Sequence, residues 1–345
     1  MEIEFREINR LIKKAKSEAL KHVNKELIKL YWNVGKFISN KLDSSRWGDG
    51  VVEQLARFLQ RTQPELKGFS RRGLYRMRQF YETYTEFENV STLLTQIPWS
   101  NHLHIIAKCK TIEEKEFYLR LSAKEKYAAR DLERQIDSCL YERTMLSKGG
   151  FPKKLKEIHG DSVNVFRDTY VLEFLQLPER FTELDLRKRI AGNLKDFLLE
   201  IGRDFSFIAE EYRLQVGNND YYIDLLFYHR GLSCLVAFEL KVTDFKPEYL
   251  GKINFYLEAL DRLAKKTNEN PSVGVLLCKS KDAEVVEFAL SRNLSPTLVA
   301  EYETKLIDKK VLRKKFHELF ELETPGQEAD EIDSTSLPIP SQNTE

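Results

Sequence analysis

The amino-acid sequence predicts a protein of mixed α+β class, in which an all-helical N-terminal region precedes an α/β domain. Three observations support this prediction. The chain has 345 residues, more than a single hydrophobic core usually holds. Apolar residues recur at helical spacing as far as about Met145, and beyond it strand patterns alternate with helical ones. Two glycines and a proline between Lys148 and Pro152 then supply a loop signal where the two patterns meet.

These patterns divide the chain into three segments. We predict a helical domain over residues 1–148, an α/β domain over residues 149–322 and a tail over residues 323–345. The tail is acidic, rich in Pro, Ser and Thr and poor in apolar groups, so it is expected to be disordered.

Charge is distributed unevenly along the chain, although the formal net charge is only +1. Residues 1–150 hold 28 Lys and Arg against 20 Asp and Glu, whereas residues 316–345 hold 8 acidic residues and no basic ones. A local basic excess favours binding to a polyanion such as nucleic acid. The first half is therefore the region expected to bind such a partner.

Neither a secretion signal nor a membrane span is expected. The first ten residues, MEIEFREINR, carry acids where a signal peptide would have a basic stretch and an apolar core. No apolar run approaches the roughly 18 residues of a membrane helix. The four cysteines are too widely spaced for a CxxC motif, which indicates reduced, mostly buried thiols. We therefore expect a cytoplasmic protein without a membrane partner.

The α/β domain is predicted from the order of its patterns. We expect helices over residues 183–201, 247–263, 283–290 and 311–322, and strands over residues 212–216, 221–228, 232–241, 273–278 and 298–302. A turn-rich link of four residues, 217–220, would join the first two strands as a hairpin. This order is typical of helices packed on the faces of a sheet.

Two carboxylates and a lysine fall on neighbouring strands of this domain. Glu239 and Lys241 lie two residues apart and so share one face of a strand, and Asp224 lies in the preceding apolar strand. Unpaired charge is costly to bury, and a divalent cation would offset that cost. Carboxylate oxygens select Mg²⁺, with Mn²⁺ as an alternative. A metal held by Asp224 and Glu239, with Lys241 orienting water or stabilising the transition state, predicts phosphodiester hydrolysis.

The Glu-x-Lys spacing alone carries little information. It also occurs at residues 65–67, 113–115 and 303–305. Only the copy at residues 239–241 ends an apolar strand, follows Asp224 by one hairpin length and precedes a helix opened by Pro247. A structural network of ion pairs on the same residues is the alternative interpretation.

The segment YYIDLLFYHRGLSCLVAFELKVTDFKPEYLGKINFYLEALDR resembles the nuclease domain of the YhcG-like family of PD-(D/E)xK proteins. This resemblance implies a restriction-endonuclease-like fold, with Asp224, Glu239 and Lys241 as catalytic residues and a metal bound by Asp224, Glu239 and the Leu240 carbonyl. It also implies an active-site role for Glu200, at the end of a preceding helix. A solvated acid at the end of a helix is the alternative for Glu200.

The helix after the lysine carries two further candidates, Lys252 and Tyr256. Nucleases related to the RecB type often have Gln-x-x-x-Tyr there, and the matching stretch here begins with a lysine. A basic residue could contact substrate phosphate, but the role of a glutamine does not transfer. Plain surface and core positions are the alternative for this pair.

A basic helix is the candidate for nucleic-acid binding in the first half. Residues 61–84 contain six basic residues and only two acidic ones, and Ser70 is a favourable N-cap. The helices on either side of a link containing Pro64 and Gly68 suggest a helix-turn-helix-like unit, although the link is long. The arginines expected to contact nucleic acid are Arg71, Arg72, Arg76 and Arg78. The alternative is a solvated basic face.

The stretches WNVGKFI, LKGFSRRGLYRMRQFY and IPWSNHLHI resemble the helical N-terminal domain of the same family, which implies nucleic-acid binding or partner docking. The sequence as a whole predicts a Mg²⁺-dependent nuclease whose substrate is nucleic acid, with DNA favoured over RNA. The rival hypothesis is a non-catalytic nucleic-acid-binding or scaffold protein that retains a nuclease fold. A homodimer that cuts both strands is left open.

Overall fold

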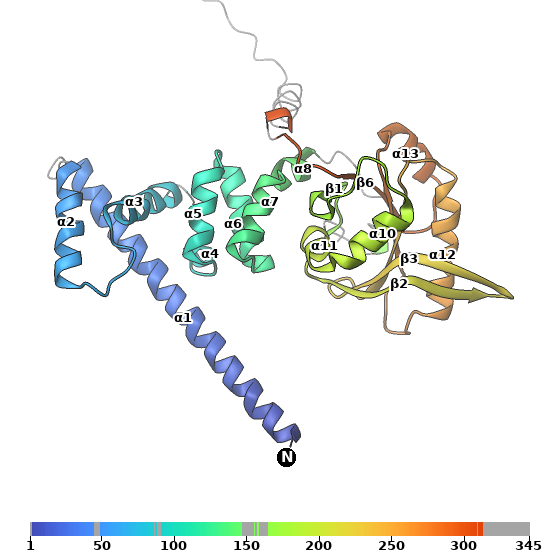
Figure 1. The fold of residues 1–345 in the computed structure, drawn as a ribbon, viewed down its shortest axis with the longest axis horizontal. Helices are drawn as coiled ribbons and strands as arrows, with labels where there is room; N and C mark the ends of the chain where they lie inside the picture. Colours follow the sequence, from blue (N-terminus) through green and yellow to red (C-terminus); the bar gives the residue numbers. More distant parts are fainter. Residues whose placement is uncertain are drawn as a thin grey trace, which may run out of the picture.

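The computed structural model describes residues 2–44, 49–85, 87, 91–146, 155, 157–158, 165–308 and 310–312. Within these residues the first half is all helical and the second half is a six-stranded sheet with helices, as Figure 1 shows. The α+β class expected from the sequence is therefore confirmed. The predicted tail, and the predicted closing helix beyond residue 312, lie outside the described residues.

The helical half comprises α1 (Glu2–Asp43), α2 (Asp49–Thr62), α3 (Arg71–Thr85), α4 (Ser91–Leu94), α5 (Trp99–Lys108), α6 (Ile112–Glu125), α7 (Ala129–Asp137) and α8 (Leu140–Leu146). The N-terminal end of α1 projects away from the other helices (Figure 1). Its C-terminal half packs along α3, where a Cβ on Gly35 would lie only 2.1 Å from the carbonyl oxygen of Met77. A residue without a side chain is thus needed where these two helices meet.

Phe80 of α3 lies at the centre of the aromatic core of the helical half. Its ring centroid lies 5.8 Å from that of Trp32, 5.2 Å from that of Trp99 and 4.8 Å from that of His102. Edge-to-face contacts of this kind add to the stabilisation from burial.

Residues 63–70 separate α2 from α3, a longer link than in a compact helix-turn-helix. The helix-turn-helix-like unit expected from the sequence therefore stays a prediction.

The second half comprises β1 (Thr169–Val171), the 3₁₀ turn η2 (Glu173–Leu175), α10 (Glu183–Gly192), α11 (Leu194–Ile201), β2 (Phe205–Val216), β3 (Asn219–His229), β4 (Cys234–Leu240), α12 (Tyr249–Leu263), β5 (Val273–Cys278), α13 (Ala283–Leu290) and β6 (Thr297–Glu303). The strand order is β1-β6-β5-β4-β3-β2. The β2, β3 and β4 strands pair antiparallel, whereas β4, β5, β6 and β1 pair parallel.

Helices cover both faces of the sheet. Phe238 and Leu240 of β4 belong to the core that includes Ile190 of α10 and Phe197 of α11. Ala237, which points the other way from the same strand, packs with residues of α12. Side chains of β4 with odd numbers therefore face α12, and those with even numbers face α10 and α11.

Four details differ from the sequence prediction. The helix expected over residues 183–201 is two helices, because Asn193 leaves the helical conformation after Gly192. The hairpin has a two-residue turn, with Val216 paired to Asn219 and Gly217 at a φ of 60° that favours glycine. The first strand of that hairpin is also longer than predicted, and β1 was missed because three residues are too few to show a period.

All four cysteines are buried and none forms a disulfide, as expected. Among the residues that the structure describes, no helix combines the length and the apolar character required to cross a membrane.

Candidate active site

The antiparallel pairing of β3 with β4 places the two predicted carboxylates at one end of the ladder. Leu225 pairs with Phe238, so that Asp224 and Glu239 are the next residues beyond this pair. The Asp224 Oδ2 atom accepts a hydrogen bond of 2.9 Å from the backbone N–H of Leu240. This bond fixes the aspartate beside the end of β4, so the structure brings together three of the residues predicted from the sequence.

Glu239 is buried, with 1% of its surface exposed. Its Oε1 atom accepts hydrogen bonds from the Lys241 ammonium at 2.9 Å and from the Lys252 ammonium at 2.6 Å. Its Oε2 atom is buried and has no hydrogen-bond partner among the residues that the structure describes. A buried carboxylate oxygen without a partner is costly, so this atom is a natural position for a cation.

The electrostatic setting of Glu239 matches this geometry. Burial raises the pKa of Glu239, and the nearby Asp224 carboxylate raises it further. The hydrogen bonds from Lys252 and Lys241 oppose this change without reversing it. The lysines thus offset only part of the cost of holding the buried Glu239 carboxylate beside Asp224, and a divalent cation would offset more of it.

Lys241 follows the last residue of β4 and is almost fully buried. Its ammonium group lies between Glu239, at 2.9 Å, and Glu183 Oε2, at 3.1 Å. Burial alone would lower the pKa of Lys241, but the two carboxylates outweigh burial and raise it. Lys241 is therefore a cation at neutral pH and suits charge stabilisation or the orientation of water better than proton abstraction.

Two residues near the carboxylates were missed by the sequence analysis. Both lie on α10, where Thr182 accepts the capping hydrogen bond that starts the helix. Glu183 contacts Lys241, and Arg187 lies 3.3 Å from Asp224 Oδ1 and 2.8 Å from Glu211. They are four residues apart and so lie on one face of α10. That spacing was visible in the sequence, but it did not show which strand the helix covers.

Glu211 has a φ of 48° within β2, which is unusual for a residue other than glycine. It lies between Glu210, which pairs with Leu225, and Tyr212, which pairs with Ile223. The strained backbone is therefore next to the strand that carries Asp224. Such strain often occurs at functional sites, where the surrounding structure holds it in place.

Lys252 and Tyr256 of α12 both lie at the site. The Lys252 ammonium contacts Glu239 and lies 5.4 Å from the centroid of the Tyr256 ring. Tyr256 is buried, with 3% of its surface exposed. The ring thus forms part of the wall beside the lysine, and its role in binding stays a prediction.

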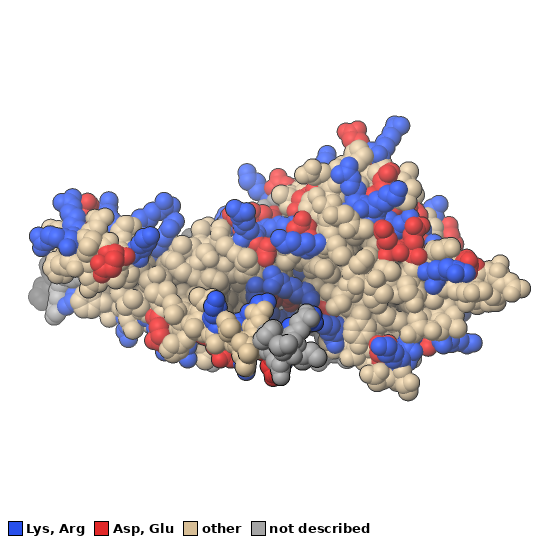
Figure 2. Space-filling model, turned by 60° about the horizontal axis from the view of Figure 1, so that its bottom comes forward, with Lys and Arg blue, Asp and Glu red and all other residues tan. Residues whose placement is uncertain are grey.

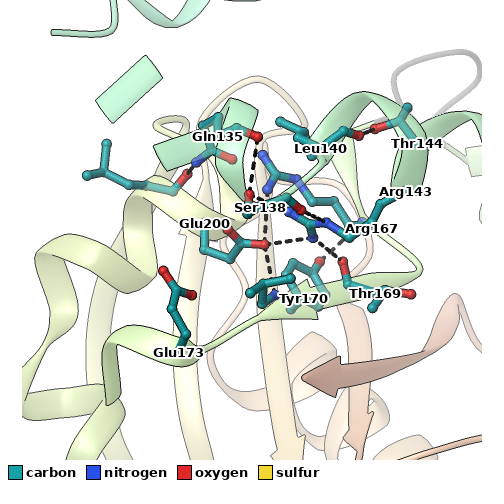
Figure 3. A network of polar contacts seen from close by, with 12 residues as sticks. Gln135, Ser138, Leu140, Arg143, Thr144, Arg167, Thr169, Tyr170, Glu173 and Glu200 are labelled. Atoms are coloured by element: carbon teal, nitrogen blue, oxygen red, sulfur yellow. Dashed lines mark hydrogen bonds and ion pairs between the residues drawn. The ribbon is translucent and has the colours of Figure 1, made fainter. Parts of the chain in front are cut away.

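Glu200 lies elsewhere, contrary to the active-site role suggested for it. It is fully buried and forms ion pairs with Arg134 and Arg143, both at 3.0 Å, and with Arg167 at 3.3 Å. It also accepts a hydrogen bond of 3.0 Å from the Val171 N–H. Figure 3 shows Glu200 with Arg143 and Arg167, where α7 and α8 of the helical half meet β1 and α11 of the sheet domain. These arginines already neutralise the charge of Glu200, which is therefore not part of the carboxylate site formed by Asp224 and Glu239.

The four arginines predicted to bind nucleic acid all lie on α3, which belongs to the helical half and is remote from the sheet (Figure 1). Arg78 forms an ion pair of 2.6 Å with Glu82, and Arg71 lies 3.9 Å from Glu53. Arg72 is exposed and Arg76 is partly exposed. They do not join the carboxylate site, and nucleic-acid binding by them stays a prediction.

The donor set of the site is compatible with a divalent cation. Asp224 and Glu239 offer carboxylate oxygens, of which Glu239 Oε2 lacks a partner. Throughout the described ranges, no group of three or more His, Cys, Asp or Glu side chains is arranged to hold a metal ion. A cation here would thus take two side-chain carboxylates and complete its shell with backbone oxygen and water, as Mg²⁺ commonly does.

Comparison with known families places this geometry in a defined class. Residues 163–317 match the model of the YhcG PDDEXK nuclease domain, and residues 7–143 match the model of the DUF1016 N-terminal domain. The sheet domain with its Asp, Glu and Lys is thus a nuclease domain of the PDDEXK type. The two models together match most of the chain, in the order of the YhcG-like family, where this nuclease domain follows a helical N-terminal domain. The predicted restriction-endonuclease-like fold is confirmed.

Individual proteins show the same relationship. "Putative nuclease YhcG" from Escherichia coli (strain K12) is 29% identical over 340 residues, which cover 88% of this chain and 90% of that protein. A solved structure of a repair endonuclease from Pyrococcus abyssi is 15% identical, with a TM-score of 0.24 over 37% of this chain and 49% of that one. The second similarity is too weak to carry an argument.

Proposed function

We propose that this nuclease domain hydrolyses phosphodiester bonds with the help of a divalent cation, Mg²⁺ or Mn²⁺, held by Asp224, Glu239 and the Leu240 carbonyl. The observation that supports the proposal is the buried Glu239 carboxylate with one oxygen unpartnered. When bound, the cation supplies Lewis acidity toward a phosphoryl oxygen and lowers the pKa of water. Carboxylates and a lysine on adjacent strand ends suit this chemistry.

Each protein group has a separate task in this proposal. Asp224 is held in place by the Leu240 N–H on one oxygen and by Arg187 on the other, so the carboxylate is oriented before substrate binds. Lys241 is a buried cation and stabilises negative charge that develops on the phosphoryl group. Lys252, which is half exposed above Glu239, contacts an incoming phosphate.

DNA is the proposed substrate, and the α3 arginines are proposed to contact its backbone. Arg72 and Arg76 are the informative pair, since the described residues offer neither of them an ion-pair partner. Replacing both with alanine is expected to weaken duplex binding and to reduce its dependence on salt. Unchanged binding would show that the basic face of α3 is exposed to solvent and does not contact DNA.

Cleavage assays with purified protein test the enzymatic part. Labelled DNA and RNA in linear, circular and branched forms are incubated with Mg²⁺ or Mn²⁺, and EDTA is expected to stop all cleavage. Asp224→Ala and Lys241→Ala should each reduce cleavage by at least about a hundredfold. Asp220→Ala is the matched control, because Asp220 lies on the same strand and pairs with Arg213 at the exposed end.

Cleavage that survives both substitutions would overturn the proposal. Tight binding of nucleic acid without cleavage, across all substrates and both metals, would instead favour the non-catalytic alternative. Titration calorimetry with Mn²⁺ separates the two outcomes, since loss of metal binding in Asp224→Ala and Glu239→Gln is expected whether or not the right substrate has been found.

A further inference from the structure

A groove on the helical half lies between α1 and the segment that runs from α4 to the start of α7. Its volume is about 1200 Å³, and its apolar lining includes Leu20, Pro98 and Ala123. Asn24 anchors the helix to the opposite wall, because its side-chain amide donates hydrogen bonds to the carbonyls of Thr95, at 3.2 Å, and Ile97, at 3.1 Å. The groove is therefore defined by a fixed contact between its two walls.

Lysines dominate the polar lining of this groove. Six line it, five on α1 and one at the C-terminal end of α6: Lys13, Lys16, Lys21, Lys25, Lys29 and Lys126. Among the described residues that line the groove there is no aspartate or glutamate. Figure 2 shows lysine and arginine side chains around a hollow near the middle of this face of the molecule. So many like charges around one concavity make it strongly attractive to a polyanion.

Most of these lysines are not neutralised by the protein. Lys29 pairs with Glu26 at 2.8 Å. Within the part of the chain that the structure describes, Lys13, Lys16 and Lys21 form no ion pair, and their side chains are exposed. A bound anion would therefore not have to displace an acidic partner from any of these three.

The spacing of the lysines on α1 suits an extended ligand. From Lys13 to Lys29 the helix rises about 24 Å, at 1.5 Å per residue. Charges repeated along such a length match the regular phosphates of a nucleic-acid strand better than a small anion. The apolar floor offers a surface for bases or sugars, as in grooves that combine basic walls with nonpolar platforms.

We infer that this lysine groove binds the sugar-phosphate backbone of a nucleic-acid strand, at a site separate from the α3 arginines and from the nuclease carboxylates. The inference rests on the proposed function, because a nuclease domain in the same chain makes nucleic acid the expected polyanion. The groove would hold a segment of the substrate while another segment reaches the carboxylates.

Binding measured without divalent metal tests the groove apart from catalysis. Fluorescence anisotropy in EDTA is recorded with single-stranded DNA, duplex DNA and single-stranded RNA of equal length, using the full chain. The test variant carries Lys13→Gln, Lys16→Gln and Lys21→Gln. The matched control carries Lys14→Gln, Lys110→Gln and Lys124→Gln, which change the charge equally at exposed lysines outside the groove. Circular dichroism confirms that both variants are folded.

The test variant should bind at least one of the three ligands about a hundredfold more weakly near 0.1 M salt, and the slope of log K against log salt should fall by about 2 for a single strand. The control variant should change affinity less than about threefold. Equal weakening in both variants, or weakening in neither, would overturn the inference. The ligand with the largest loss identifies the type of strand that the groove holds.

The same variants separate this inference from the proposed function. If the wild-type protein cleaves nucleic acid but the groove variant binds as well as wild type, only the groove assignment fails. If the groove variant loses binding but the wild-type protein cleaves nothing with any metal, only the catalytic proposal fails.

Discussion

Two buried glutamates of the sheet domain have opposite electrostatic settings. Glu200 is surrounded by the guanidinium groups of Arg134, Arg143 and Arg167 and by a backbone N–H. Burial alone would raise its pKa, but the arginines outweigh burial and lower the pKa of Glu200 to about 2. Glu239 is buried to nearly the same extent, yet its pKa is raised and one of its oxygens has no partner.

This difference separates a structural acid from a candidate functional one. The ion pairs of Glu200 join α7 and α8 to the sheet domain, and a neighbouring hydrogen bond of 3.1 Å from Gln135 to the Leu199 carbonyl supports the same contact. One oxygen of Glu239 has no partner in the described part of the chain, and a ligand could supply it. A buried acid is thus a better indicator of function when its hydrogen-bonding capacity is incomplete than when it is saturated.

The largest effect is expected when the unsatisfied acid is neutralised. Glu239→Gln should reduce cleavage by at least about a thousandfold, equivalent to about 4 kcal/mol, because a metal-binding oxygen is lost. The free energy of unfolding without metal should change by less than about 1 kcal/mol, since Lys241 keeps its contact with Glu183. Single-turnover cleavage and urea unfolding in EDTA measure the two quantities.

A large loss of stability together with full activity in Glu239→Gln would reverse the comparison and make Glu239 the structural acid. Glu258→Gln serves as a control, because this exposed glutamate on α12 pairs with Arg262 one turn away. Both quantities should stay close to wild type in that variant.

Neutralising the satisfied acid should act on stability. Glu200→Gln leaves three arginines without their shared carboxylate, and we expect the free energy of unfolding to fall by about 3 kcal/mol. Glu173→Gln is the matched control, since Glu173 binds the same Arg134 but is more exposed, and it should cost about 1 kcal/mol. Urea unfolding monitors both. A loss in Glu200→Gln no larger than in the control would show that the network contributes little to the contact.

The sequence predicted the carboxylate site better than it predicted the surroundings of that site. Strand period and hairpin length were enough to place Asp224 beside Glu239, because alternation in a strand is a local property. Glu200 was assigned to the wrong neighbourhood because its position depends on Arg134 and Arg143, which lie more than fifty residues earlier in the chain. No local pattern reports a partner at that separation.

Glu183 and Arg187 were missed for a related reason. Their spacing on α10 was visible, but the split between α10 and α11 at Asn193, and hence the direction in which α10 crosses the sheet, was not predicted. Lys252 was found through the match to the Gln-x-x-x-Tyr motif, whose spacing a single unbroken helix preserves. Pairs within one element are thus more predictable than pairs between elements.

The two glutamates should also give the protein opposite responses to pH. Glu200 has a lowered pKa, so its contribution to stability is present above 4.5 and is lost as the pH falls from 4.5 toward about 2. That loss amounts to about 3 kcal/mol. Glu239 has a raised pKa, so its favourable contribution without metal is present below 4.5 and is lost as the pH rises through the folded pKa.

Unfolding by urea in EDTA, measured as a function of pH, checks both signs. Glu200→Gln should remove most of the loss of stability that occurs as the pH falls below 4.5. Glu239→Gln should remove the loss of stability that occurs as the pH rises. Identical pH profiles for the wild type and both variants would show that neither carboxyl has the shifted pKa that its surroundings imply.

The smallest effect concerns the lysine that partly offsets the charge of Glu239. The hydrogen bond from Lys252 lowers the pKa of Glu239, so Lys252→Met should raise that pKa further. A metal ion competes with the proton for this carboxylate, and the pH at which Mn²⁺ binding is half complete should therefore move upward, by less than about one unit. Lys246→Met, outside the contact, is the control. Calorimetric titration over a range of pH measures the shift, and a midpoint that moves downward would show that Lys252 acts on the cation by repulsion rather than through Glu239.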